Sequence, residues 1–326
     1  MSETVLRVED LRTHFFTRSG VVKAVDGVSF SVGRGETLGI VGESGSGKSV
    51  TALSILRMVA APAGKIVGGR ILLRGDDLLE KSEKEMVKIR GARISMILQD
   101  PMTSLDPLFT IGDQLAEPVR IHQRNSTVSV QARVEEMLRL VRIPAPEQRV
   151  HDYPHQMSGG MRQRIVGAIA LACQPELLIA DEPTTSLDVT IQLQFLALLK
   201  DVQRQLDLAM IIITHDFGIV ARICHRVAVM YAGRIVEAAD VRALFRNPAH
   251  PYTVALLKSL PRLGAEADRL FTIGGQPPDL RHHPPGCSFA PRCIRAMDIC
   301  SREYPPQRDV GEHHLVSCHL TGKSEG

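Results

Sequence analysis

An eight-residue stretch, Gly42-Glu43-Ser44-Gly45-Ser46-Gly47-Lys48-Ser49, constrains the fold of this chain more than any other feature. It fits the pattern G-x-x-x-x-G-K-[ST], follows the apolar run 37–41, and precedes an apolar-rich segment at about 48–59 that we predict to be a helix. A strand, a glycine-rich loop and a helix in this order let backbone N–H groups surround a phosphate at the positive end of the helix dipole. Lys48 is expected to reach the β- and γ-phosphates of a nucleotide, and the Ser49 hydroxyl to bind Mg²⁺.

Apolar patterns elsewhere in the chain predict alternating strands and helices. Strands separated by helices favour an α/β fold with a largely parallel core sheet. We predict strands at 28–32, 177–180 and 209–213, helices at 134–141, 161–172 and 190–206, and a hairpin at 226–239 around Ala232-Gly233.

Two carboxylates, Asp181 and Glu182, end the predicted strand at 177–180. A solvated acidic pair is common at a strand end. Beside a phosphate loop, however, the first carboxylate is expected to help hold Mg²⁺ and the second to polarise an attacking water.

Three further features fit a phosphate site, although each also has an ordinary structural explanation. Ser158-Gly159-Gly160 precedes a predicted helix and could present donors to a phosphate, or Ser158 could simply cap that helix. His215 follows the predicted strand at 209–213, where it could contact a γ-phosphate or be structural. Gln99 follows the apolar run 94–98 and could contact Mg²⁺ or water.

Composition excludes several classes of protein. The chain has 326 residues, with 39 basic and 36 acidic side chains, no Trp and 4% aromatic residues, which argues against nucleic-acid binding. No window reaches the roughly 18–20 consecutive apolar residues of a membrane span, and the N-terminus has no signal-peptide pattern. We therefore expect a cytosolic chain with no transmembrane segment of its own.

Taken in order, the motifs resemble the ATP-binding subunit of an ABC transporter over essentially the whole chain. The resemblance implies Gln99 as the Q-loop glutamine, Ser158-Gly159-Gly160-Met161 as the signature motif and His215 as the switch histidine. It implies that Asp181 and Glu182 end the Walker B strand. It also places the D-loop at Ser186-Leu187-Asp188 and an adenine-stacking aromatic at Phe15, or at its neighbour Phe16.

The signature departs from the family pattern, because Met157 and Met161 stand where Leu and Gln are usual. Met for Leu is a volume-conserving apolar exchange, and we do not infer an inactive site.

Other segments resemble the dipeptide, oligopeptide and nickel importer branch of this family, and the first ATPase subunit of dipeptide importers in particular. These segments are Gln99–Pro107, Tyr153–Gln156, Asp181–Thr190 and His250-Pro251-Tyr252-Thr253.

The fold that this resemblance implies is a P-loop ABC ATPase. We expect a mixed or parallel core sheet, an N-terminal antiparallel β subdomain, a helical subdomain at about 100–160, and a small loop-rich C-terminal appendage. Prolines crowd the chain beyond residue 247, so we predict an ATPase domain at 1–250 and a C-terminal region at 251–326.

Four cysteines, Cys287, Cys293, Cys300 and Cys318, fall in that C-terminal region. The intervals between them are five, six and seventeen residues, which match neither the close pairs of zinc sites nor ferredoxin spacings. Spacing therefore leaves an iron–sulfur cluster, a structural zinc ion and free or redox-active thiols open. The tail resembles that of dipeptide-importer ATPases, which implies a [4Fe–4S] cluster.

The resemblance also implies the activity and the partners. We expect an ATP-hydrolysing subunit on the cytoplasmic face of the membrane that drives uptake of di- or oligopeptides. Its partners would be a second, homologous ATPase, two transmembrane permease subunits and an extracytoplasmic solute-binding protein. The alternatives are a soluble ABC ATPase of translation or DNA repair, an importer of nickel, glutathione or haem, and a regulatory module whose ATP hydrolysis is dispensable.

Overall fold

A computed structural model of the chain describes residues 3–99, 104–123, 127–185, 187–260 and 271–322. The chain divides into two compact units, each made of separate segments. The first unit contains residues up to Arg7, Ser31–Thr37 and Ile71–Thr214, and the second contains Val8–Phe30, Leu38–Arg70 and the residues from His215 onward. The predicted boundary at residue 250 stays a prediction.

The core of the first unit is a set of parallel strands. β7 (Leu177–Asp181) pairs in parallel with β6 (Ile94–Ile97) on one side and with β8 (Ala209–Thr214) on the other. Every residue of β7 and β8 is buried, which explains why these strands are continuous apolar runs rather than alternating ones. The predicted strands at 177–180 and 209–213 are confirmed.

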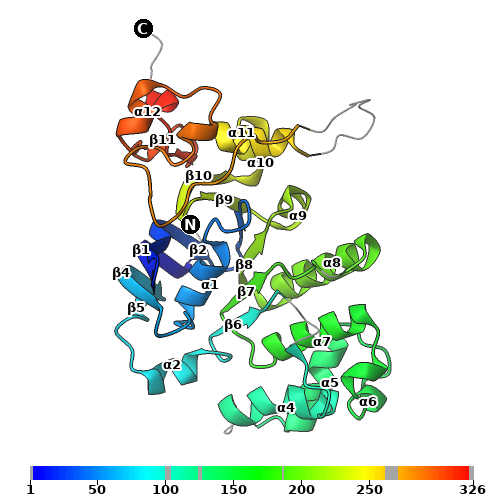
Figure 1. Cartoon of the computed structure of the whole chain (residues 1–326). Coiled ribbons are helices and arrows are strands. Elements are labelled where there is room, and N and C mark those ends of the chain that lie inside the picture. Colours follow the sequence, from blue (N-terminus) through cyan, green and yellow to red (C-terminus); the bar gives the residue numbers. More distant parts are fainter. Residues whose placement is uncertain (1–2, 100–103, 124–126, 186, 261–270, 323–326) are drawn as a thin grey trace. The chain divides into compact units, whose positions relative to one another are not determined.

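Helices make up most of the rest of the first unit, and α4, α5 and α7 pack against one another (Figure 1). The helix predicted at 134–141 is confirmed by α5 and its C-cap Val141, and the residues Val134, Met137, Leu138 and Val141, which share one face, are all buried. The helices are α2 (Glu83–Ile89), α4 (Ile111–His122), α5 (Val130–Leu140), α6 (Pro146–Arg149), the 3₁₀ turn η1 (Pro154–Gln156), α7 (Gly159–Leu171) and α8 (Val189–Leu206).

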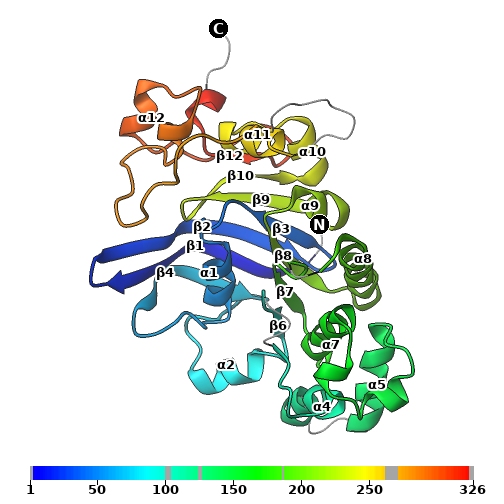
Figure 2. The same cartoon turned by 45° about the vertical axis from the view of Figure 1, so that its right-hand side comes forward.

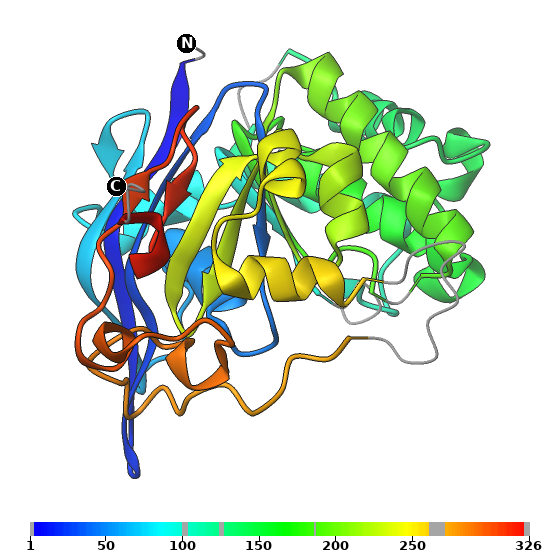
Figure 3. The ribbon, with the colours of Figure 1, turned by 90° about the horizontal axis from the view of Figure 1, so that it is seen from above.

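The second unit has a mixed sheet. β9 (Arg226–Tyr231) pairs in parallel with β3 (Thr37–Val41) and antiparallel with β10 (Arg234–Asp240). β12 (Leu315–Val316) pairs with β10, and β11 (Arg308–Asp309) pairs with β12. The red C-terminal strand therefore lies beside the yellow strands in Figure 3.

The predicted hairpin at 226–239 is confirmed, and its turn explains the sequence there. Ala232 and Gly233 link β9 to β10 with φ of +48° and +80°. A two-residue turn with both residues in the left-handed region matches the right-handed twist of the strands that it joins.

Long strands form a second sheet in the order β2-β1-β4-β5, of which β2, β1 and β4 are labelled in Figure 2. Its strands are β1 (Thr4–Thr17), β2 (Gly20–Gly33), β4 (Gly64–Leu73) and the short β5 (Asp76–Asp77). Val28 and Val32 of β2 are buried, as the alternating pattern predicts.

The helices of the second unit are short. α1 (Lys48–Ile55) begins at the predicted residue but ends four residues before the predicted end at 59. The helix stops because Arg57 has a left-handed backbone, with φ of +52°. The other helices are α9 (Phe217–Ile223), α10 (Val241–Arg246), α11 (Pro251–Lys258), η2 (Ala290–Arg292), α12 (Asp298–Arg302) and η3 (His319–Gly322).

Among the described residues, no helix combines the length and the apolar character that crossing a membrane requires.

Packing between α7 and α8 offers a test of the first unit. Phe195 of α8 is 1% exposed, and its ring lies against the backbone of α7 at Gly167. We expect Phe195→Ala to lower the free energy of unfolding by about 3–5 kcal/mol, because it removes a buried aromatic ring and leaves a cavity. Leu193→Ala, at a position that is 38% exposed on the same helix, is the control and should change it by less than about 1 kcal/mol. Equal losses in urea unfolding would contradict this packing.

Candidate functional site

The loop Gly42–Ser49 leads from β3 into α1: Gly42–Gly47 link the two elements, and Lys48 and Ser49 are the first residues of the helix, as the sequence predicts. Two of its glycines are required by close contact with other backbone. A Cβ on Gly42 would lie 2.2 Å from the carbonyl oxygen of Met230, and one on Gly47 would lie 2.3 Å from that of Ala24. Both have positive φ, +157° and +102°, so the loop depends on glycine for space and, at Gly47, also for conformation.

Lys48 lies inside this loop and is 6% exposed. Its Nζ donates to the carbonyl oxygens of Gly42 and Glu43, at 2.8 and 2.9 Å. The Ser46 hydroxyl is buried and has no hydrogen-bond partner among the described residues. Ser44 and Gly45 are exposed, and Ser49 is partly exposed in the first turn of α1. An ammonium group, a buried hydroxyl and the first turn of a helix suit a phosphate.

The two aromatic candidates for adenine stacking are neighbours on β1. Phe15 lies near Gly64, where an added Cβ would be 2.9 Å from its ring. Phe16 is exposed, and the Lys65 ammonium lies over its ring at 5.6 Å from the centroid. Successive strand residues face opposite sides, so only one of the two can serve a given site.

In the first unit, the structure brings Gln99 and Glu182 together. Gln99 Nε2 donates to Glu182 Oε2 at 3.3 Å, and the Thr185 hydroxyl donates to the same oxygen at 2.9 Å. Glu182 has φ of +45°, and its N–H donates to the carbonyl oxygen of Ile213. Asp181, the last residue of β7, is buried. A carboxylate oriented by two donors in this way can act as a general base.

Ser158 is the N-cap of α7, because its hydroxyl accepts a hydrogen bond from the N–H of Met161 at 3.3 Å. The same hydroxyl keeps its own proton for donation, so the cap and a phosphate contact are compatible. Gly160 is needed for packing, since a Cβ there would lie 2.7 Å from Ile191 of α8. Gly159 is exposed, with open space at its Cβ position.

Asp188 is the N-cap of α8, where its Oδ1 accepts a hydrogen bond from the N–H of Ile191 at 2.9 Å. His215 directly follows β8 and precedes α9, whose N-cap is Asp216. Two predicted segments, Asp100–Thr103 of the Q-loop and Ser186 of the D-loop, lie outside the described residues.

Two residues that no sequence motif identifies hold these segments in place. Gln163 is fully buried and donates to the carbonyl oxygen of Pro183, just after the two carboxylates. Arg292 forms an ion pair with Glu43 of the phosphate loop. Neither residue belongs to a recognisable motif, because a single polar side chain whose partner lies far away in the sequence leaves no local pattern.

The four C-terminal cysteines line one cavity, together with His250. Within the part of the chain that is described, no three His, Cys, Asp or Glu side chains form a group that could hold a metal ion. The other two cysteines lie apart from that cavity. Cys173 is buried in the first unit, and burial raises the pKa of Cys224 to about 12. Both behave as small apolar side chains, and Cys224 packs against the core of the second unit.

A strand that leads into a phosphate loop, a second strand that ends in two carboxylates, and a glycine-rich helix start define a P-loop ABC ATPase. Comparison with known proteins agrees. Residues 25–185 match the family described as "ABC transporter", and residues 236–300 match "Oligopeptide/dipeptide transporter, C-terminal region". The chain belongs to the ATP-binding subunits of peptide, dipeptide and oligopeptide ABC importers, and as an ABC ATPase it hydrolyses ATP.

Two curated relatives illustrate the similarity. The chain is 54% identical to a probable peptide ABC transporter ATP-binding protein of Sinorhizobium fredii, over 97% of this chain and 95% of that one. It is 52% identical to the dipeptide transport ATP-binding protein DppD of Bacillus subtilis, over 98% and 95%. Neither relative is named for translation or DNA repair.

Solved ABC cassettes share the fold. The structure resembles cbiO1 of Clostridium perfringens, part of the ABC transporter complex cbiONQ, with a TM-score of 0.64 and 28% identity, over 76% of this chain and 92% of that one. It resembles the dimeric bacterial ABC transporter cassette MJ0796 with a TM-score of 0.64 and 25% identity, over 73% and 99%.

Two glycines of the loop provide a direct test of its geometry. We expect Gly47→Ala to weaken ATP binding by at least about tenfold, because its Cβ would collide with the carbonyl oxygen of Ala24 and distort the loop. Gly45→Ala is the matched control, since Gly45 also has positive φ but has open space at its Cβ position. Calorimetric titration with ATP measures both affinities. The clash would be irrelevant if the two variants bound equally well.

Proposed function

We propose that the loop residues Gly42–Ser49 bind the phosphates of ATP, with Lys48 on the β- and γ-phosphates and Ser49 as a ligand of Mg²⁺. The observation that carries this proposal is the loop itself, in which a buried ammonium and a buried hydroxyl that has no hydrogen-bond partner in the described part of the chain lie near the start of α1. Phe15 would stack on the adenine. Asp181 and Gln99 would complete the Mg²⁺ site.

Glu182 would activate the attacking water. Gln99 and Thr185 both donate to its Oε2, so the carboxylate is held in one orientation before any substrate arrives. His215 would contact the γ-phosphate. Lys48 would give up its bonds to loop carbonyls in favour of phosphate oxygens, which are stronger acceptors.

The signature residues would act on the nucleotide of a partner ATPase. Ser158 and Gly159 are exposed at the start of α7, a thirteen-residue helix, so its first N–H groups can donate hydrogen bonds to an anion from outside the chain. Two homologous subunits would pair head to tail, with Asp188 in the same junction. ATP would then favour the closed pair to the extent that it binds that state more tightly.

Two permease subunits and an extracytoplasmic binding protein would complete the importer, with this chain on the cytoplasmic face of the membrane and peptides as the solute. The helical part of the first unit offers a surface for a permease. A groove there combines the exposed Phe109 with three carboxylates, Asp106, Asp113 and Glu117, and one cation, Arg120. Its charge is therefore net negative, which suits a segment that is apolar and basic.

Hydrolysis by Glu182 is testable in the assembled transporter. We expect Glu182→Gln to lower the ATPase rate by about 10²–10⁴-fold, because the amide cannot take a proton from water. ATP binding should persist. Glu147→Gln, which removes an exposed carboxylate of the same unit, is the control. The site would be regulatory rather than a motor if peptide uptake survived in the Glu182 variant.

We also propose that Cys287, Cys293, Cys300 and Cys318 hold a [4Fe–4S] cluster. The chain folds so that all four line one cavity, and hydrogen bonds hold the segments together. Cys287 N–H donates to the carbonyl oxygen of Cys300 at 2.8 Å, and the close approach requires Gly286, whose Cβ would lie 2.2 Å from that oxygen. A zinc ion needs four ligands around one point, whereas each cysteine of a cluster binds a different iron.

A further observation supports a bound group at these cysteines. Burial raises the pKa of the Cys287 thiol to about 11, and burial also raises the pKa values of Cys293 and Cys318, so as free thiols they would stay protonated and unreactive at neutral pH, and a metal would have to displace their protons to bind. His250 lines the same cavity, and its Nε2 is buried with no hydrogen-bond partner among the described residues.

Metal analysis of the anaerobically purified chain distinguishes the alternatives. We expect about four irons and four sulfides per chain, with broad visible absorbance, because four cysteines ligate one such cluster. Cys293→Ala should remove both, and Cys224→Ala, outside the cavity, should remove neither. Stoichiometric zinc without iron would replace the cluster by a structural zinc ion. If the analysis finds neither iron nor zinc, the cysteines are free thiols and the cluster proposal is wrong.

A further inference from the structure

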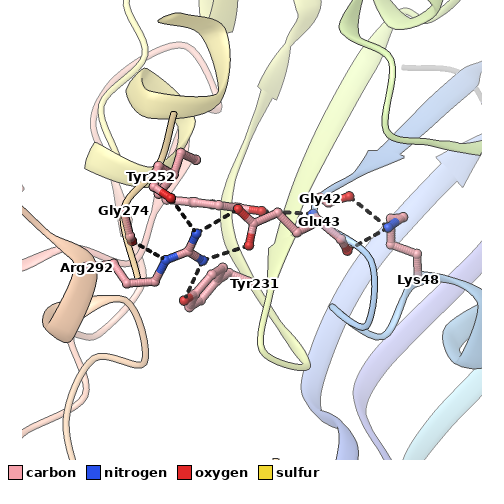
Figure 4. A network of polar contacts seen from close by, with 8 residues as sticks. Gly42, Glu43, Lys48, Tyr231, Tyr252, Gly274 and Arg292 are labelled. Atoms are coloured by element: carbon pink, nitrogen blue, oxygen red, sulfur yellow. Dashed lines mark hydrogen bonds and ion pairs between the residues drawn. The ribbon is translucent and has the colours of Figure 1, made fainter. Parts of the chain in front are cut away.

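Glu43, the second residue of the phosphate loop, points away from the loop interior and toward Arg292 of the C-terminal region (Figure 4). Arg292 donates two parallel hydrogen bonds to its carboxylate, Nη1 to Oε2 at 2.7 Å and Nη2 to Oε1 at 3.0 Å. A bidentate pair of this kind fixes both distance and direction.

Arg292 is itself held tightly. Its side chain is 5% exposed, its Nε donates to the carbonyl oxygen of Gly274 at 3.0 Å, and its Nη1 also contacts the Tyr231 hydroxyl at 3.2 Å. It ends η2 and directly precedes Cys293. The guanidinium is thus fixed by the C-terminal region before it meets the loop, so little side-chain freedom is lost when the pair forms.

A second contact reaches the backbone of the same residue. The N–H of Glu43 donates to the Tyr252 hydroxyl at 2.9 Å. Tyr252 is fully buried, and its ring packs against Tyr231 and Phe289, with centroids 4.6 and 5.3 Å away. Burial raises the pKa of Tyr252, so the hydroxyl stays neutral.

The turn that carries Tyr252 is also anchored. Glu237 of β10 is fully buried and accepts hydrogen bonds from the N–H groups of Ala249 and His250, at 2.7 and 3.0 Å. His250 Nδ1 in turn accepts from the N–H of Tyr252 at 3.1 Å. The two contacts with Glu43 therefore come from separately supported parts of the C-terminal region.

We propose that Arg292 and Tyr252 are positioning residues of the ATP site, through which the C-terminal region sets the affinity of the phosphate loop for ATP. Tyr252 would fix the loop backbone where phosphates bind. Arg292 would fix the loop through the side chain of Glu43. It would also neutralise the Glu43 carboxylate, which would otherwise repel the phosphates of ATP. This inference rests on the proposed phosphate site at Gly42–Ser49.

Titration of the full-length chain with MgATP tests the proposal. We expect Arg292→Ala to weaken ATP binding by about tenfold or more, since it breaks a largely buried charge-assisted pair. Arg292→Lys should recover part of the lost ATP affinity, because it restores the positive charge but cannot form two parallel hydrogen bonds to the carboxylate. Arg281→Ala, which removes the exposed ion pair with Asp279, is the matched control and should leave the affinity unchanged.

Two further variants separate positioning from general damage to the fold. Tyr252→Phe keeps the packed ring and removes only the hydroxyl, so it should weaken ATP binding several-fold with the melting temperature nearly unchanged. Glu43→Gln in the Arg292→Ala background should bind ATP more tightly than Arg292→Ala alone, because it removes the unpaired charge. In the assembled transporter, KM for ATP should rise while kcat stays within about twofold.

Lys48→Ala distinguishes a failure of the inference from a failure of the proposed site. If Lys48→Ala abolishes ATP binding while Arg292→Ala and Tyr252→Phe both bind as the unaltered chain does, the positioning role is wrong and the site stands. If Lys48→Ala binds ATP normally, the proposed phosphate site is wrong and the inference falls with it.

Discussion

Backbone-to-backbone contact at the phosphate loop is the constraint on which the second unit depends. The loop passes so close to the β9–β10 hairpin and to β2 that Gly42 and Gly47 have no room for a Cβ. The N–H of Gly233, in the hairpin turn, donates to the carbonyl oxygen of Ser46 at 2.9 Å. Because carbonyl oxygens and N–H groups of neighbouring strands define the position of this loop, its shape is a property of the sheet and not of the loop alone.

The C-terminal region also packs against this sheet and contacts the phosphate loop. Its residues extend the core formed by β9 and β10, where Tyr231, Tyr252 and Phe289 pack against one another. Through Arg292 and Tyr252 it reaches the loop residue Glu43, and through η2 and α12 it arranges the cysteines around their cavity. The helices and strands described in this region are short, so hydrogen bonds to β10 and the group proposed at the cysteines would both stabilise it.

At two helix N-termini of the first unit, the residue that caps the helix also belongs to a motif of the expected ATP site. Ser158 and Asp188 cap α7 and α8, and each belongs to a motif that resemblance assigns to ATP. The two explanations of Ser158 that the sequence left open are therefore not alternatives, because a hydroxyl can accept one hydrogen bond and donate another. Gly160 has a reason of its own, since α8 approaches α7 too closely for a side chain there.

Local pattern by itself determined the phosphate loop, the buried strands β7 and β8, the stripe on α5 and the hairpin at Ala232-Gly233, because each depends on residues close in sequence. It overestimated α1, since the left-handed backbone at Arg57 has no signature in the pattern. Only the tertiary structure decided the pairs Glu43–Arg292, Gln163–Pro183 and Gln99–Glu182, which join residues 249, 20 and 83 positions apart. Such pairs form because the packing of whole helices and strands brings single polar groups together. Sequence periodicity reports only which face of an element is buried, so it does not predict these pairs.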